Sequence, residues 1–217
     1  MAPARKQIRI DVISDTVCPW CYIGKRRLER ALEQRADAIE AEVRYHPFQL
    51  DPTVPAEGAD ARTHFAAKFG SWERFLQIAS HVAAVGAAEG IPFAFEKATR
   101  TPNTLESHRL AWLAAGTGRQ LDVIERLFAA HFVEGRDVGS REVLVDIGAA
   151  AGLDAAEVRA ALAGDAGVAE VRGALEEARR LGISGVPFFI VQGKYALSGA
   201  QPVEVFLQLL DRAAAEA

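Results

Sequence analysis

The spacing of hydrophobic residues changes twice along the chain and divides it into three stretches. Residues 8–13 alternate between apolar and polar and then become apolar, which predicts a strand entering a core. Residues 18–35 carry apolar positions three and four apart and open with a proline, as helices do. Residues 42–50 predict a second strand. The order strand, helix, strand favours a parallel strand pair joined by a crossover helix.

The middle stretch, about 62–180, has helical spacing interrupted by turns that contain glycine, proline, asparagine or aspartate. An aromatic-rich segment begins it, and the expected helices that follow cover 108–115, 121–133, 141–151, 155–162 and 171–181. We interpret Phe65, Phe69, Trp72 and Phe75 as helix packing rather than as a cofactor site. The last stretch predicts a hairpin of strands at 187–191 and 195–198, followed by a helix that opens at Pro202.

Composition and charge fit a globular protein. Half of the residues are hydrophobic, 25% are charged and the net charge is −4, which argues against nucleic acid or an anionic membrane as the main partner. The basic cluster Lys25-Arg26-Arg27 with Arg30 is expected to be a solvated helix face. No apolar run is long enough for a secretory signal or a membrane span, so a chain complete as given is expected in the cytoplasm.

The two cysteines, Cys18 and Cys21, form a Cys-Pro-Trp-Cys motif at the predicted start of the first helix. A bridge across so short a loop adds little stability, so their proximity points to chemistry. Free N–H groups and the helix dipole favour a thiolate at a helix N-terminus. We therefore expect Cys18 to attack a disulfide, and Cys21, one turn further in and less exposed, to resolve the mixed disulfide.

The motif could also be part of a structural zinc site, and the nearby Asp15 has two possible roles. A structural zinc site needs two further ligands, and the five histidines are scattered without a closely spaced pair, which argues against zinc. Asp15, three residues before Cys18, would either accept a proton from Cys21 or cap a turn, and the cap is favoured.

Four segments resemble DsbA-type thioredoxin-fold oxidoreductases, most closely the cytoplasmic FrnE-like branch. They are Asp15-Thr16-Val17-Cys18-Pro19-Trp20-Cys21-Tyr22-Ile23-Gly24, Thr101-Pro102-Asn103-Thr104-Leu105-Glu106-Ser107-His108-Arg109-Leu110, Gly182-Ile183-Ser184-Gly185-Val186-Pro187-Phe188-Phe189 and Tyr195-Ala196-Leu197-Ser198-Gly199-Ala200-Gln201. They span nearly the whole chain in the expected order, and the first and third are specific when they occur together.

This resemblance implies an α/β, thioredoxin-like fold with a long all-α insertion, as in DsbA. The thioredoxin-like domain would be discontinuous, residues 1–56 and 182–217, and the helical insertion subdomain would cover 57–181. It further implies a cis peptide bond between Val186 and Pro187, on a loop that faces the cysteines. The backbone of Val186 would there pair with an extended substrate strand.

The resemblance also suggests roles for neighbouring residues. Pro19 and Trp20, between the thiols, would tune the redox poise, and Trp20 would also contact substrate. Because strongly oxidising relatives carry a histidine there, Trp20 argues against an extreme oxidant. Asn103 and His108 would line the substrate groove between the insertion and the active site, although a helix N-cap region and a satisfied core histidine describe them as well.

The expected function is dithiol–disulfide exchange on a protein or a small thiol, with the cysteine pair itself as redox carrier. No metal or organic cofactor is required, glutathione is left open as a co-substrate, and the recycling reductase is unknown. Two alternatives remain. Kappa-type glutathione transferases and hydroxychromene-carboxylate isomerases share the expected fold but typically have serine at the position of Cys18 and lack the pair. A cysteine-independent chaperone-like module is the other.

Overall fold

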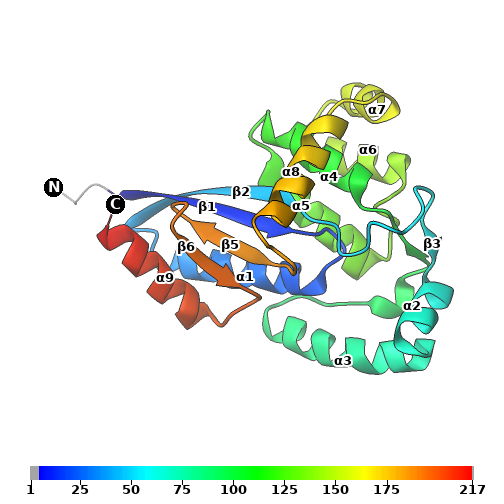
Figure 1. Ribbon diagram of the computed structural model, residues 1–217, viewed down its shortest axis with the longest axis horizontal. Helices are drawn as coiled ribbons and strands as arrows, with labels where there is room; N and C mark the ends of the chain where they lie inside the picture. The colour runs from blue at the N-terminus through cyan, green and yellow to red at the C-terminus, as the bar shows by residue number, and fades with distance from the viewer. Residues whose placement is uncertain (1–4, 217) are drawn as a thin grey trace.

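The computed structural model describes residues 5–216, and its centre is a four-stranded mixed sheet (Figure 1). The strand order is β2-β1-β5-β6, with β1 at Lys6–Ser14, β2 at Ile39–Pro47, β5 at Phe188–Val191 and β6 at Tyr195–Ser198. The β1–β2 pair is parallel, as the sequence predicted, whereas β5 is antiparallel to both β1 and β6. The expected hairpin near the C-terminus is therefore confirmed.

The second strand lies three residues earlier than its pattern predicted. β2 begins at Ile39, which pairs with Lys6, and ends at Pro47. The next residue, Phe48, donates its N–H to the carbonyl of Ser14, the last residue of β1, at 2.9 Å. The apolar residues at 48 and 50 thus belong to the loop that meets the end of β1 rather than to the strand. Phe48 packs against the cluster that contains Ile13, whereas Leu50 is 45% exposed.

Helices cover both faces of the sheet (Figure 1). On one face α1, Pro19–Glu33, and α9, Val203–Ala215, pack on the inward side chains of β1 and β5. The rings of Phe189 and Phe206 meet edge to face there, with centroids 4.9 Å apart. On the other face the end of α8, Val168–Arg180, packs through Ala178 onto Ile13.

The chain between β2 and β5 is mainly helical, in agreement with its spacing. Its elements are β3 (Ala59–Asp60), α2 (Ala61–Phe69), α3 (Trp72–Ala88), η1 (Phe95–Lys97), β4 (Arg100–Thr101), α4 (Leu105–Ala115), α5 (Gln120–Ala129), η2 (Ala130–Glu134), α6 (Arg141–Ala150), α7 (Ala155–Ala163) and α8. The aromatic-rich segment forms two helices, because Gly70 has a positive φ of 95° and Ser71 caps α3 by accepting from the N–H of Arg74. The rings of Phe65 and Phe75 stack at 4.1 Å, which confirms that this segment packs as a core.

The basic cluster on α1 is not a solvated face, so that prediction was wrong. Lys25 is only 5% exposed, and its Nζ bonds Glu29 and, at 2.7 Å, Glu125 of α5. The Nε of Arg27 donates to Glu89, the C-cap residue directly after α3, at 2.7 Å. A local pattern shows a run of cations, but the acids that pair with them come from distant parts of the chain. The cluster therefore joins α1 to α5 and α3.

Candidate active site

The motif Cys-Pro-Trp-Cys forms the first turn of α1, directly after β1. Cys18 is the N-cap, with extended backbone angles of φ −96° and ψ 111°, and Pro19 is the first helical residue, where it leaves no N–H unsatisfied. The N–H of Cys21 donates to the carbonyl of Cys18 at 3.0 Å, which places the two residues one turn apart. Cys18 thus lies where the positive end of the helix dipole favours an anion.

Both cysteines are free thiols, and both residues are buried. Cys18 is 3% exposed and Cys21 is 2% exposed, so the expected difference in exposure is absent. The reason is tertiary: the Sγ of Cys18 lies 3.6 Å from the carbonyl oxygen of Val186, on the loop that leads into β5. The Val186 carbonyl accepts from the Cys18 thiol in this arrangement.

The surroundings of Cys21 disfavour its ionisation. Burial raises the pKa of the Cys21 thiol well above its ordinary value, and the neighbouring Cys18 raises it further. The hydroxyl of Ser14 and the backbone of Asp15 act in the opposite direction but do not outweigh burial. Cys21 is therefore held as a protonated thiol, and its role as the resolving sulfur stays a prediction.

The peptide bond between Val186 and Pro187 is cis, as the resemblance implied. The loop that contains it lies against α1 at Gly24. A Cβ on Gly24 would come 3.0 Å from the Cγ of Pro187 and 3.1 Å from the Cζ of Phe189, which is closer than Cβ contacts normally are. Because Gly24 has no side chain, it permits the close approach of α1 and the loop that contains Val186, next to Cys18.

The carboxylate of Asp15 binds long-range partners instead of capping the local turn, and its role as a proton acceptor for Cys21 stays a prediction. Its carboxylate is buried, accepts from the N–H of Leu50 at 2.8 Å, and lies 3.3 Å from the Nε2 of His108. The carboxylate therefore links the end of β1 to the loop after β2 and to α4. The favoured turn cap is replaced by these long-range partners, because three segments distant in sequence meet at this point.

His108 and Asn103 hydrogen-bond to the protein itself. The Nε2 of His108 also lies 2.9 Å from the carbonyl of Phe48, and its side chain is 5% exposed. Asn103 donates to the carbonyl of Val54 at 2.7 Å and accepts from the N–H of Leu105 at the start of α4. These contacts agree with a core histidine and an N-terminal cap of α4, and a part in substrate binding stays a prediction.

A second contact of the same helix reaches the active-site loop. The hydroxyls of Thr16 and Ser107 are 2.7 Å apart, and Ser107 also donates to the carbonyl of Thr104. The segment 101–110, noted in the sequence for its resemblance, therefore holds the loop that precedes Cys18.

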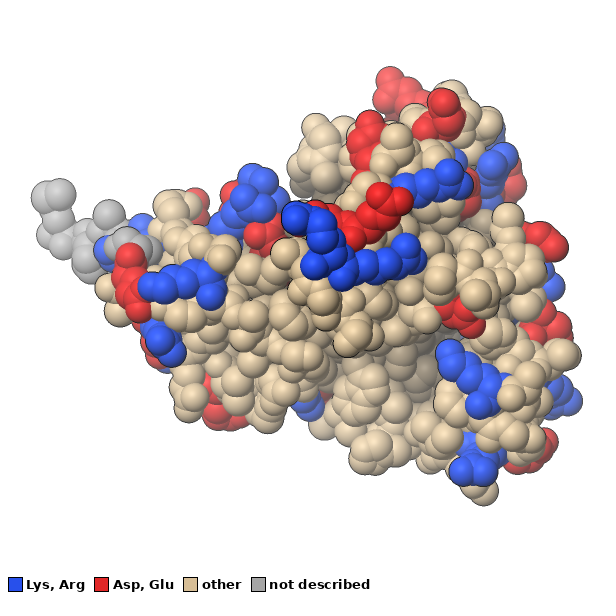
Figure 2. Space-filling model, in the orientation of Figure 1, with Lys and Arg blue, Asp and Glu red and all other residues tan. Residues whose placement is uncertain are grey.

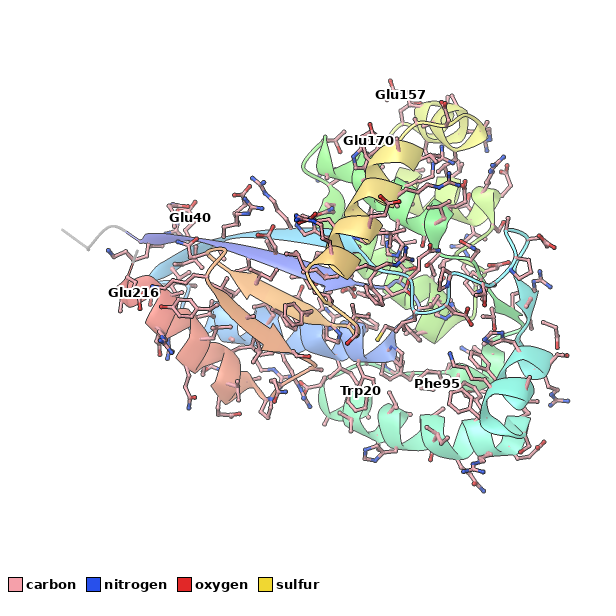
Figure 3. The ribbon with its side chains drawn as sticks, viewed as in Figure 1. Trp20, Glu40, Phe95, Glu157, Glu170 and Glu216 are labelled. Atoms are coloured by element: carbon pink, nitrogen blue, oxygen red, sulfur yellow. The ribbon has the colours of Figure 1, made fainter. Side chains whose placement is uncertain are left out.

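Trp20 lies at the surface beside the cysteines. It is 36% exposed and is located between the start of α1 and α3 (Figure 3). The space-filling view shows few charged side chains between the β5–β6 hairpin and α3 (Figure 2). Pro19 is partly buried in the same turn. A small cavity of about 90 Å³ lies beside the loop that precedes Cys18 and is lined by Val17, Leu50 and His64, among others.

Sequence reasoning missed Ser14 and the contact made by Gly24. The signal for Ser14 was present, because it continues the inward alternation of Ile8, Ile10 and Val12 on β1. Within residues 5–216, no three histidine, cysteine, aspartate or glutamate side chains are placed to hold a metal ion together. The helices in the same range also include none that is long and apolar enough to cross a membrane.

Similarity to known proteins identifies the family of this chain. A family model described as the DSBA-like thioredoxin domain matches residues 9–211, and the chain belongs to this family of thiol–disulfide oxidoreductases. The crystal structure of the probable DsbA oxidoreductase SCO1869 from Streptomyces coelicolor is 38% identical, with a TM-score of 0.88, over 97% of this chain and 91% of that one. The thioredoxin-like fold with a helical insertion is thereby confirmed.

Two more distant structures share the fold alone. The cytosolic disulfide reductase DsbM from Pseudomonas aeruginosa, solved with GSH, is 23% identical, with a TM-score of 0.65, over 94% of this chain and 98% of that one. A 2-hydroxychromene-2-carboxylate isomerase is 16% identical, with a TM-score of 0.69, over 96% of this chain and 97% of that one. The fold therefore hosts both disulfide and isomerase chemistry, and the site must distinguish them.

Proposed function

We propose that the protein exchanges disulfides through the Cys18–Cys21 pair. The observation that supports it best is the placement of two free thiols one turn apart at the start of α1, with Val186 and the cis Pro187 beside Cys18. The Cys18 thiolate attacks a substrate disulfide, forms a mixed disulfide and releases one substrate thiolate. Cys21, on losing its proton, attacks the Cys18 sulfur. The second substrate sulfur leaves with the electron pair and takes up a proton.

The substrate we propose is an extended polypeptide or a small thiol whose backbone pairs with Val186 while its side chains contact Trp20. The buried Cys18 supports a substrate that displaces the Val186 contact before reacting. A thiol such as glutathione would return the oxidised pair to the dithiol, so the carrier is the cysteine pair and no metal or organic group enters the cycle. Trp20, in place of the histidine of strong oxidants, favours reduction or isomerisation.

A cytoplasmic location is part of the proposal. It is supported by the direction of the chemistry, because a glutathione-buffered compartment keeps such a pair reduced. The DsbM protein of Pseudomonas aeruginosa, which shares the fold, is described as cytosolic and as a reductase.

The test compares the wild-type protein with Cys18→Ser in insulin-disulfide reduction. Serine is a good N-cap, so the variant should fold, which circular dichroism and the melting temperature verify. We expect its activity to fall to the background rate of the reductant alone. Retained activity would contradict the proposal. A glutathione-dependent isomerisation of a small aromatic substrate that survives replacement of both cysteines by serine would favour the isomerase class instead.

A further inference from the structure

Ser14 carries a buried hydroxyl that the fold itself does not explain. It is the last residue of β1, its side chain lies on the same face as Ile10 and Val12, and that face packs against α1. The residue is 3% exposed, and its Oγ has no hydrogen-bond partner within residues 5–216. Buried hydroxyls are almost always paired, so an unpaired one calls for a functional reason.

Cys21 lies on the buried face of α1 that packs in the same core as this face of β1. The hydroxyl of Ser14 and the backbone of Asp15 both act to lower the pKa of the Cys21 thiol, which burial raises. The charged and titratable groups around the sulfur do not supply a base. Cys18 on α1 opposes a second negative charge, and Tyr45 on β2 is a buried phenol.

The carboxylate on the neighbouring helix α5 is already paired with other side chains. Glu125 of α5 is bonded to Lys25, Arg26 and Tyr22. Of these groups, Ser14 is the one whose hydroxyl has no hydrogen-bond partner within residues 5–216.

We propose that Ser14 donates a hydrogen bond to the Cys21 thiolate during resolution of the mixed disulfide and so sets the rate of that step. The inference rests on the proposed function. In the step the S–H bond of Cys21 breaks and the Cys18–Cys21 disulfide forms as the bond from Cys18 to the substrate sulfur breaks. That sulfur carries away the electron pair and, in the end, the proton. Ser14 lowers the cost of the negative charge that Cys21 bears between these events.

The experiment follows the two steps separately with Ellman's reagent in a stopped-flow instrument. Attack by Cys18 releases one equivalent of thionitrobenzoate, and attack by Cys21 releases the second. For Ser14→Ala we expect an unchanged first phase. The second phase should be about tenfold slower at pH 7, the typical worth of one hydrogen bond to a charged group. The pH midpoint of the second phase should move upward. An unchanged rate and midpoint in the folded variant would overturn the inference.

Controls separate a loss of chemistry from a loss of folding. Tyr195→Phe removes another buried hydroxyl that has no hydrogen-bond partner within residues 5–216, at the end of the β5–β6 hairpin away from Pro187, and should leave both phases unchanged. If Ser14→Ala does not fold, Ser14→Thr and Ser14→Val form an isosteric pair, and only the threonine should resolve quickly. Equal rates in that pair would overturn the inference. If the wild-type protein releases only one equivalent, the proposed function fails rather than the role of Ser14.

Discussion

The two halves of α1 differ in how well their polar groups are paired. At the first turn the Cys18 thiol contacts the carbonyl oxygen of Val186, and the hydroxyl of Ser14, on the face of β1 that packs against α1, has no hydrogen-bond partner within residues 5–216. The following turns carry cations that are almost all matched: Lys25 and Arg26 share Glu125, and Arg27 and Arg30 share Glu89. One helix thus combines an under-satisfied end with a tightly bonded body.

The difference shows how a reactive end is kept in place. A sulfur that must lose a proton and change partners cannot be fixed by strong bonds of its own, because those bonds would oppose each step of exchange. The ion pairs to α5 and α3, together with the packing of α1 on the sheet, hold the helix instead. Substitutions in the first turn should therefore change chemistry with little effect on folding, and substitutions further along should do the reverse.

The largest effect should come from Cys21→Ser. Without the second sulfur the mixed disulfide cannot be resolved inside the protein, so turnover should fall to background while Cys18 still reacts. Intact mass spectrometry should show one substrate thiol bound per chain, and Ellman's reagent should release one equivalent instead of two. Cys18→Ser should trap none. Turnover at the wild-type rate would show that Cys21 is not the resolving group.

Gly24 lies at the boundary between the two halves, so its substitution should affect both properties. In Gly24→Ala the new methyl group meets the side chains of Pro187 and Phe189, which must give way by a few tenths of an ångström, and we expect this to disturb the loop beside Cys18. We expect kcat/KM to fall by about tenfold and stability by about 1–3 kcal/mol. Gly173→Ala is the matched control, since its Cβ meets nothing within 4 Å on α8, and it should stabilise by about 0.5–1 kcal/mol. Activity assays and denaturant unfolding measure both; a variant with unchanged kcat/KM would remove the loop from the mechanism.

The smallest effect should come from Glu125→Gln, which changes the residue of α5 that pairs with Lys25 and Arg26 in the later turns of α1. We expect a loss of about 1–2 kcal/mol at pH 7 with the exchange rate unchanged. Burial alone would raise the pKa of Glu125, but bonds from Lys25, Tyr22 and Arg26 hold it below its ordinary value.

The pH dependence of this effect has a definite sign. The stabilisation is fully present above the ordinary glutamate pKa of about 4.3 and is lost as the pH falls through the lower folded value. Unfolding curves of the wild-type protein and Glu125→Gln should therefore converge in acid. Glu142→Gln, an exposed partner of Arg159, should change stability by less than about 0.5 kcal/mol at any pH. Curves that stay apart in acid would refute the assignment to Glu125.

Local patterns predicted those features that depend on neighbours in sequence. The alternation of β1, the proline after Cys18, and the helical spacing of the insertion each reflect constraints within a few residues, and each matches the structure. The predicted bounds of β2 were wrong because the apolar side chain of Phe48 packs against the cluster of Ile13, near the end of β1, and not within the strand. The basic cluster of α1 was misjudged because Glu125 lies 100 residues from Lys25.

By itself the sequence determined that two cysteines lie one turn apart where a strand meets a helix, since that follows from spacing, proline and periodicity alone. Only the tertiary structure decided how those sulfurs are surrounded. Val186 contacts Cys18 from the far end of the chain, Ser14 lies on the face of β1 that packs against α1, and the carboxylate of Asp15 is bound by Leu50 and His108. The reason is physical: spacing fixes local geometry, whereas burial and hydrogen bonding are set by segments that meet only when the chain folds.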